Sequence, residues 1–272
     1  MSLNSVNTNV GAMLALQSLN AINRELFTVQ NRISTGLKVA SAKDDPATWA
    51  IAQHQRSELS GLDAVTASLQ RGQSIVDVAM TAGESIVDIL GQMKQKALAA
   101  QDTSLDAASR ASLLQDYDAL RKQIDQVANN SDFNGVSLIS AGSAGSVKAL
   151  ANTRATATIN VDHVDLSTSG SILSGVIPDA FGNVNMANLE ASIKAATAAV
   201  AKLGSGAKAL DTHLNFIEKL HDTMEASIGR LVDADIAKEA ARYQALQVKQ
   251  QLAIQALSIA NRAPQMLLQL FQ

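Results

Sequence analysis

The 272-residue chain contains no cysteine and only three prolines, and aromatic residues make up just 3% of it. The absence of cysteine excludes a disulfide scaffold, a thiolate metal site and a cysteine nucleophile. The shortage of aromatics disfavours an ordinary globular core, because each aromatic side chain can bury roughly 150–250 Å². Few prolines leave long stretches without helix breakers. Together these shortages favour helices packed closely along their length.

Charge and hydropathy exclude further classes of protein. The chain has 22 basic and 25 acidic residues and a pI of about 5.8, which is not the footprint of a nucleic-acid-binding protein. No window approaches 18 uninterrupted apolar residues, so we expect no transmembrane helix. The first ten residues lack both the basic and the apolar region of a secretory signal, so we also expect no cleaved signal peptide.

What the chain has instead is apolar residues, 47% of the total, which recur at the alternating three-four spacing of a coiled-coil seam. The first seam falls within residues 1–42, and we expect its helix to end near Gly36. The assembly positions predicted from this seam are Val10, Leu19, Ile22, Leu26, Val29 and Ile33.

A second helix is predicted from Pro46 to about Ala100. Asp45 can cap it, and proline suits the first helical position, where its missing N–H costs nothing. Such a helix would be roughly 80 Å long at ~1.5 Å per residue. Three-four spacing predicts its seam at eleven positions: Leu62, Val65, Leu69, Gly72, Val76, Ala79, Gly83, Ile86, Leu90, Met93 and Ala97. The small residues among them, Gly72, Ala79 and Gly83, would let another helix backbone approach closely.

A third seam, from Leu113 to Val127, ends before a polar stretch, and Phe133–Gly135 reads as a turn. Residues 43–135 therefore form the long helices of a core bundle. Residues 136–188 are rich in Ser, Gly, Thr and Asn and lack helical periodicity. We interpret them as a short β and loop insert, with a strand near 157–164 and a possible hairpin turn at Gly182-Asn183.

Helical periodicity returns in residues 189–234, which we assign to the core bundle, and continues in 235–272 after the polar Asp233-Ala-Asp235. We expect the last helix to stop at Asn261–Pro264, before an apolar tail. The assembly positions predicted here are Leu246, Leu257, Leu267, Leu268 and Leu270. The sequence thus predicts a mainly α fold: a long-helix coiled-coil bundle with a small β-rich insert and paired N- and C-terminal helices.

The seams have two interpretations. They can form an internal antiparallel bundle only, which we favour for the middle of the chain. The terminal helices would lack a core unless they pair with each other and with other chains, so for them we favour assembly.

Catalytic and ligand-binding signals are weak. The segments Gly142–Lys148 and Gly204–Lys208 do not fit the phosphate-binding loop, which needs four residues between its glycines and Ser or Thr after Lys. The carboxylates of Asp44 and Asp45 supply too few ligands for calcium, so capping is the better interpretation. The histidines form no zinc pair, and His221, which lies in a seam, is interpreted as a core or partner-facing residue. We predict no enzyme activity, no cofactor and no metal.

Short segments near both ends match a known sequence signature. Near the N-terminus they are Val6–Asn9, Ile33–Leu37, Ala42–Asp45 and Ala50–Ala52; near the C-terminus they are Gly229–Asp235, Ala237–Glu239 and Ala260–Leu270. In this order and spacing they resemble the terminal signatures of bacterial flagellins, and Phe133–Gly135 matches the turn that closes the family's third helix. The resemblance covers both termini and most of the helical core.

The resemblance implies a structural subunit that is exported by the flagellar type III pathway and polymerises into the extracellular filament used for swimming. Residues 1–42 and 235–272 would pair as the inner assembly layer. The implied partners are copies of the chain itself, an export chaperone and the export apparatus, the filament cap and hook-junction proteins; no nucleic acid or membrane is implied. A hook–filament junction protein, or from another class a cytoplasmic coiled-coil adaptor, is the alternative.

Two sites, a triplet and a single residue, depart from the family's pattern. Many flagellins carry an Arg-Glu-Leu triplet near the end of the first long helix, which an animal innate immune receptor recognises. A gapless count from Phe133 places Lys94, Gln95 and Lys96 there, which argues against recognition by that receptor. Trp49 replaces the small residue that is usual at its position.

Overall fold

The structure is a computed structural model that describes residues 8–142, 145–178 and 184–269. Its helices are α1 (Val10–Thr35), α2 (Pro46–Ala100), α3 (Ala107–Asn129), α4 (Met186–Val232) and α5 (Ile236–Gln269), with strands β1 (Val147–Leu150) and β2 (Thr158–Val161) and the 3₁₀ helix η1 (Ser174–Val176) between α3 and α4. This confirms the predicted mainly α fold with a small β insert and paired terminal helices.

Local sequence explains where the first helices begin and end. Asn9 caps α1, since its side-chain oxygen accepts a hydrogen bond from the N–H of Ala12, and Gly36 ends the helix in the left-handed conformation with φ of 73°, which glycine adopts without strain. The Asp45 carboxylate accepts hydrogen bonds from the N–H groups of Ala47 and Thr48 and so caps α2. These observations confirm the predicted end near Gly36 and the predicted cap.

The structure corrects one expected helix end. The backbone of α5 continues through Pro264 to Gln269, whereas the sequence predicts an end at Asn261–Pro264. A proline inside a helix removes one backbone hydrogen bond and crowds the preceding turn, yet the helix runs on here. The proposed hairpin turn at Gly182-Asn183 lies outside the described residues.

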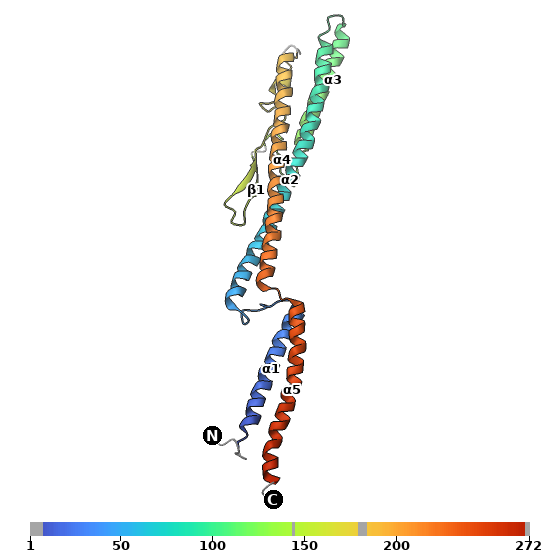
Figure 1. The fold of residues 1–272 in the computed structure, drawn as a ribbon. Coiled ribbons are helices and arrows are strands. Elements are labelled where there is room, and N and C mark those ends of the chain that lie inside the picture. The colour runs from blue at the N-terminus through green and yellow to red at the C-terminus, as the bar shows by residue number, and fades with distance from the viewer. Residues whose placement is uncertain (1–7, 143–144, 179–183, 270–272) are drawn as a thin grey trace. The chain divides into compact units, whose positions relative to one another are not determined.

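The chain forms two compact units, and α2 and α4 each contribute to both. Unit 1 is Met1–Ser57 with Thr223–Gln272, and unit 2 is Glu58–Asp222. In unit 1, α1 and α5 lie side by side as an antiparallel pair (Figure 1). Backbone hydrogen bonds join the two connections at one end of the pair, from Lys38 N to the Val232 oxygen and from Ala234 N to the Gly36 oxygen.

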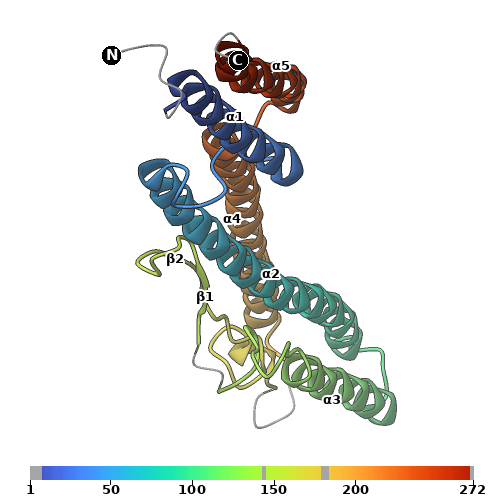
Figure 2. The same cartoon turned by 90° about the horizontal axis from the view of Figure 1, so that it is seen from below.

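Unit 2 is built on the predicted seam of α2, in which all eleven positions are buried: Leu62, Val65, Leu69, Gly72, Val76, Ala79, Gly83, Ile86, Leu90, Met93 and Ala97. Helices α3 and α4 and the insert lie around α2 (Figure 2), and each contributes buried apolar residues to this core. The antiparallel strands β1 and β2 pair Val147 with Val161 and Leu150 with Thr158. The insert also supplies core residues, because Leu138, Ile139, Leu166 and Leu173 are fully buried.

Candidate assembly surface

The predicted assembly seam of α1 lies mostly within the pair that α1 forms with α5. Val29 is 1% exposed, Leu19, Ile22, Leu26 and Ile33 are half-buried, and Val10 is exposed. On α5, Leu246 is 4% exposed and Leu257 is half-buried. The side chains of Leu267 and Leu268, and all of Leu270, lie outside the described residues. The described seam residues other than Val10 therefore join the two terminal helices of one chain.

Both helices carry a second apolar set that this pairing leaves exposed. It comprises Val10, Met13, Leu14, Leu16 and Phe27 on α1, and Ile236, Val248, Leu252, Ile254 and Ile259 on α5. Only Val10 among them was predicted as an assembly position, because a heptad picks out one seam and most of these residues fall between its positions. Apolar residues at non-seam positions of an otherwise polar helix are the signal that could have revealed them.

Polar side chains form four contacts across the α1–α5 pair, two hydrogen bonds and two ion pairs. The Asn9 amide donates to the Ala260 carbonyl oxygen at 2.7 Å, and the Gln250 amide donates to the Asn23 side-chain oxygen at 2.7 Å. The further contacts are ion pairs, Arg242 with Glu25 at 3.5 Å and Arg32 with Glu239 at 3.2 Å. Glu239 has only 12% of its side chain exposed. Such directional contacts distinguish one helix register from another more sharply than apolar packing alone.

The loop before α2 is held by its two aspartates. The Asp44 carboxylate accepts hydrogen bonds from the N–H groups of Ala40 and Ser41 and from the Ser41 hydroxyl. The hydrogen bond from the Ser41 backbone lowers the pKa of Asp44, and the hydrogen bond from the Thr48 hydroxyl lowers the pKa of Asp45. Both carboxylates therefore stabilise the turn and the helix start, as the capping interpretation predicts.

Small residues were predicted where another helix backbone would approach α2, and at the two glycines the atoms nearest to an added Cβ belong to side chains of unit 2. A Cβ built on Gly83 would come within 2.8 Å of Val200 Cγ2 on α4. At Gly72 it would meet Ala149 of β1 at 3.2 Å. Ala79 is fully buried. Whether enlarging these residues destabilises the chain stays a prediction.

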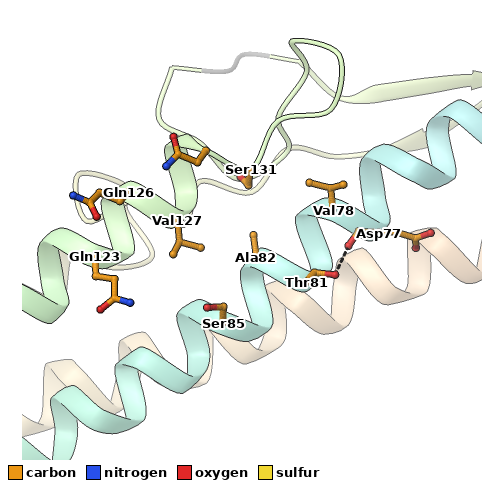
Figure 3. Close-up of a pocket in the computed structure, with 10 residues that line it drawn as sticks. Asp77, Val78, Thr81, Ala82, Ser85, Gln123, Gln126, Val127 and Ser131 are labelled. Atoms are coloured by element: carbon orange, nitrogen blue, oxygen red, sulfur yellow. Dashed lines mark hydrogen bonds between the residues drawn. The ribbon is translucent and has the colours of Figure 1, made fainter.

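A groove of about 670 Å³ runs between α2 and α3. Figure 3 shows Val78 and Ala82 of α2 and Val127 of α3 pointing into the space between the helices. The rest of its lining is hydroxyl and amide groups with one carboxylate: Asp77, Thr81, Ser85, Gln123, Gln126, Asn130 and Ser131. This groove was not predictable from the sequence, because it forms only where two helices lie side by side.

The remaining residues of interest have structural contacts. His221 Nε2 lies 3.5 Å from Asp63 Oδ1 across α4 and α2. Lys94 pairs with Glu190, and Lys96 pairs with Asp116, each at 2.7 Å. Trp49 is half-buried in the first turn of α2.

Within the described ranges, no group of three or more His, Cys, Asp or Glu side chains is placed to hold a metal ion. Among the same residues, no helix combines the length and the apolar character needed to cross a membrane.

Comparisons with known proteins agree with the terminal signatures. Residues 6–144 match the family model of the bacterial flagellin N-terminal helical region, and residues 186–271 match that of the C-terminal helical region. Flagellin FljK of Caulobacter vibrioides is 49% identical over 274 residues, with both chains covered completely. Flagellin C of Rhizobium meliloti is 29% identical over 323 residues, covering 99% of this chain and all of the relative. A crystal structure of Bacillus cereus flagellin matches 54% of this chain and 86% of its own, with 24% identity and a TM-score of 0.48.

The family models cover most of the chain, and the matched relatives span its full length. The comparisons support neither a hook–filament junction protein nor a coiled-coil adaptor. This chain belongs to the bacterial flagellin family and is a structural subunit of the flagellar filament.

Proposed function

We propose that copies of this chain polymerise through the apolar faces that the α1–α5 pair leaves exposed, with residues 1–42 and 235–272 as the inner assembly layer. The exposure of large side chains such as Met13, Phe27 and Ile259, at 63%, 67% and 71%, supports this proposal. Contiguous exposed apolar surface marks interaction sites in soluble proteins. Its burial between copies would supply roughly 25 cal/mol per Å² of stability.

In this proposal the predicted seams have two roles. Leu19, Ile22, Leu26, Val29, Ile33, Leu246 and Leu257 hold α1 against α5, and the pair then presents its outer faces to neighbouring copies. Leu267, Leu268 and Leu270 extend the apolar surface of the C-terminal end. Residues 43–135 and 189–234 form the core bundle, and residues 136–188 are its variable insert.

The role we propose is mechanical rather than catalytic. Interlocked subunits transmit the rotation of a basal motor along the filament, which turns it into thrust. The filament is extracellular, and the chain reaches it through an export chaperone and the flagellar export apparatus, with the filament cap and hook-junction proteins as further partners. Membership of the flagellin family supports this assignment. Lys94, Gln95 and Lys96 support the expectation that the animal receptor does not recognise the chain.

Paired substitutions on α1 and α5 test the proposed surface. Leu14→Asp and Leu252→Asp place a carboxylate on exposed apolar positions, at 61% and 58% exposure. The matched controls Gln17→Asp and Gln255→Asp add the same charge to exposed polar positions of the same helices. We expect the leucine variants to lose polymerisation in sedimentation and electron microscopy, and the glutamine variants to retain it. Filaments formed equally by all four variants would contradict the proposed faces.

A further inference from the structure

Unit 2 has a second surface besides the groove between α2 and α3. A hollow of about 540 Å³ beside β2 and α4 is lined by Ile159, Ser205, Lys208, Ala209, Thr212, His213 and Phe216. Phe216 is 55% exposed, and its ring lies 5.7 Å from the ring of His213. His213 is held in turn by a hydrogen bond between Nε2 and the Ala151 carbonyl oxygen at 2.8 Å. An apolar ring is therefore held on the surface of this unit by its neighbours.

An exposed aromatic ring on one surface and a small apolar floor in the other make the two surfaces complementary in polarity. The groove has a floor of small apolar side chains, Val78, Ala82 and Val127, which leaves room for an aromatic ring. Aromatic anchors that fill a partner's hollow typically dominate the energetics of an interface. Around the floor, hydroxyl and amide groups of the groove can form hydrogen bonds with Ser205 and Thr212 of the hollow.

Their charges are also complementary. Asp77 is the one carboxylate that lines the groove, and Lys208 is the one ammonium group that lines the hollow. Neither takes part in an ion pair within the described part of the chain. Each can therefore pair with the opposite charge of another copy, and complementary charges of this kind select the partner and its register.

Building on the proposed function, we propose that the exposed Phe216 ring of one copy enters the α2–α3 groove of the next copy, with Lys208 beside it opposite Asp77. The contact joins two different surfaces of the same chain. A contact between different patches produces a ring or an open helical polymer, whereas a contact of one patch with itself stops at a dimer. This contact therefore adds a lateral link outside the α1–α5 layer and propagates along a filament.

Exchanging the charges of Asp77 and Lys208 tests the proposed contact between copies. Asp77→Lys and Lys208→Asp each place like charges opposite each other in a pure sample, and we expect the critical concentration for polymerisation to rise at least about fivefold. An equimolar mixture of the two variants restores opposite charges at every contact if the subunits alternate. We expect the mixture, and the double variant, to return to within about twofold of the parent. Asp222→Lys, at an exposed acid of α4 outside both surfaces, is the control and should polymerise like the parent.

Cross-linking gives an independent readout, because the chain has no cysteine of its own. A variant carrying Ser85→Cys in the groove and Thr212→Cys in the hollow should give a ladder of covalent oligomers when its filaments are oxidised. Either single-cysteine variant should remain monomeric on a denaturing gel. Circular dichroism of each variant beside the parent checks that the helices are retained.

The outcomes separate this contact from the proposed function. If the parent chain forms no filaments, the proposed function fails. If the parent forms filaments but the charge variants polymerise like the parent and the double-cysteine variant gives no ladder, the groove contact is wrong and the proposed function stands. Covalent dimers from a single-cysteine variant would show a contact of one patch with itself and would likewise overturn the inference.

Discussion

At the scale of single residues, Tyr117 joins α3 to the insert through one buried hydroxyl. The residue is fully buried, and its hydroxyl donates a hydrogen bond of 2.7 Å to the Val176 carbonyl oxygen. Burial raises the pKa of Tyr117 to about 12, above its ordinary value of 10.0. Leaving a buried carbonyl without a hydrogen-bond donor costs about 1–3 kcal/mol, so this contact stabilises the packing of the insert against the bundle.

Tyr117→Phe should therefore lower the free energy of unfolding by about 1–2 kcal/mol near neutral pH. The raised pKa adds a pH dependence. The folded chain keeps the proton between pH 10 and about 12 while the unfolded chain releases it, so the parent loses stability as pH rises through this window. The phenylalanine variant should lack this part of the loss. Urea unfolding of both proteins from pH 9 to 11.5 measures the difference, and parallel curves would contradict the assignment.

The glycines of α2 differ in what surrounds them. Gly61, Gly72 and Gly83 recur every eleven residues. A Cβ added to them would meet Thr153, Ala149 and Val200 respectively, whereas a Cβ added to Gly91 would meet nothing within 4 Å. The heptad pattern predicted close packing at Gly72 and Gly83. It did not predict Gly61, because this residue lies outside the three-four positions of the seam.

Gly91→Ala should stabilise the chain by up to ~1 kcal/mol, since alanine favours a helix interior. Gly83→Ala should not show this gain, because Val200 Cγ2 lies 2.8 Å from the new Cβ and a β-branched side chain has little freedom to move. Gly83→Leu should lose about 1–3 kcal/mol by overpacking. Thermal unfolding of the three variants gives the ranking, and equal stability of Gly83→Leu and the parent would show that the contact relaxes freely.

At the scale of elements, helix ends were predictable wherever a local capping signal exists. Asp45 with Pro46 marks the start of α2, and Gly36 marks the end of α1. The wrong end at Pro264 shows the converse, because one proline weakens a helix without determining where it stops. The register of α1 against α5 could not be predicted either, since it depends on long-range contacts such as Arg32 with Glu239.

That ion pair provides a test of the register. Arg32→Glu and Glu239→Arg each place like charges together at a largely buried position, and we expect each to destabilise the terminal pair by about 1–3 kcal/mol. The double variant restores opposite charges and should recover most of the loss. The measurement is the temperature at which filaments dissociate. If the two single effects simply add in the double variant, the residues do not interact.

At the scale of the whole molecule, the sequence predicted the order of the helices and their burial better than the role of the insert. The seam of α2 is buried at every predicted position because heptad spacing directly reports which face of a helix is covered. The insert supplies fully buried residues such as Leu166 and Leu173. They were not predicted, because isolated apolar residues in a polar segment carry no periodic signal.

The division into two units predicts how the chain responds to truncation. Unit 2, Glu58–Asp222, has its own core on the α2 seam, so a chain that lacks residues 240–272 should retain most of its helical circular dichroism and unfold cooperatively. The deletion removes Leu246 and the exposed apolar residues from Val248 to Ile259, and it leaves the seam of α1 without a partner. We therefore expect the truncated chain to stay in the supernatant at concentrations at which the parent sediments as filaments. It should also fail to join parent filaments in a mixture, because both the α1–α5 pair and its outer faces are lost. Pelleting of the truncated chain as filaments, with a helical spectrum like that of the parent, would show that assembly does not need α5.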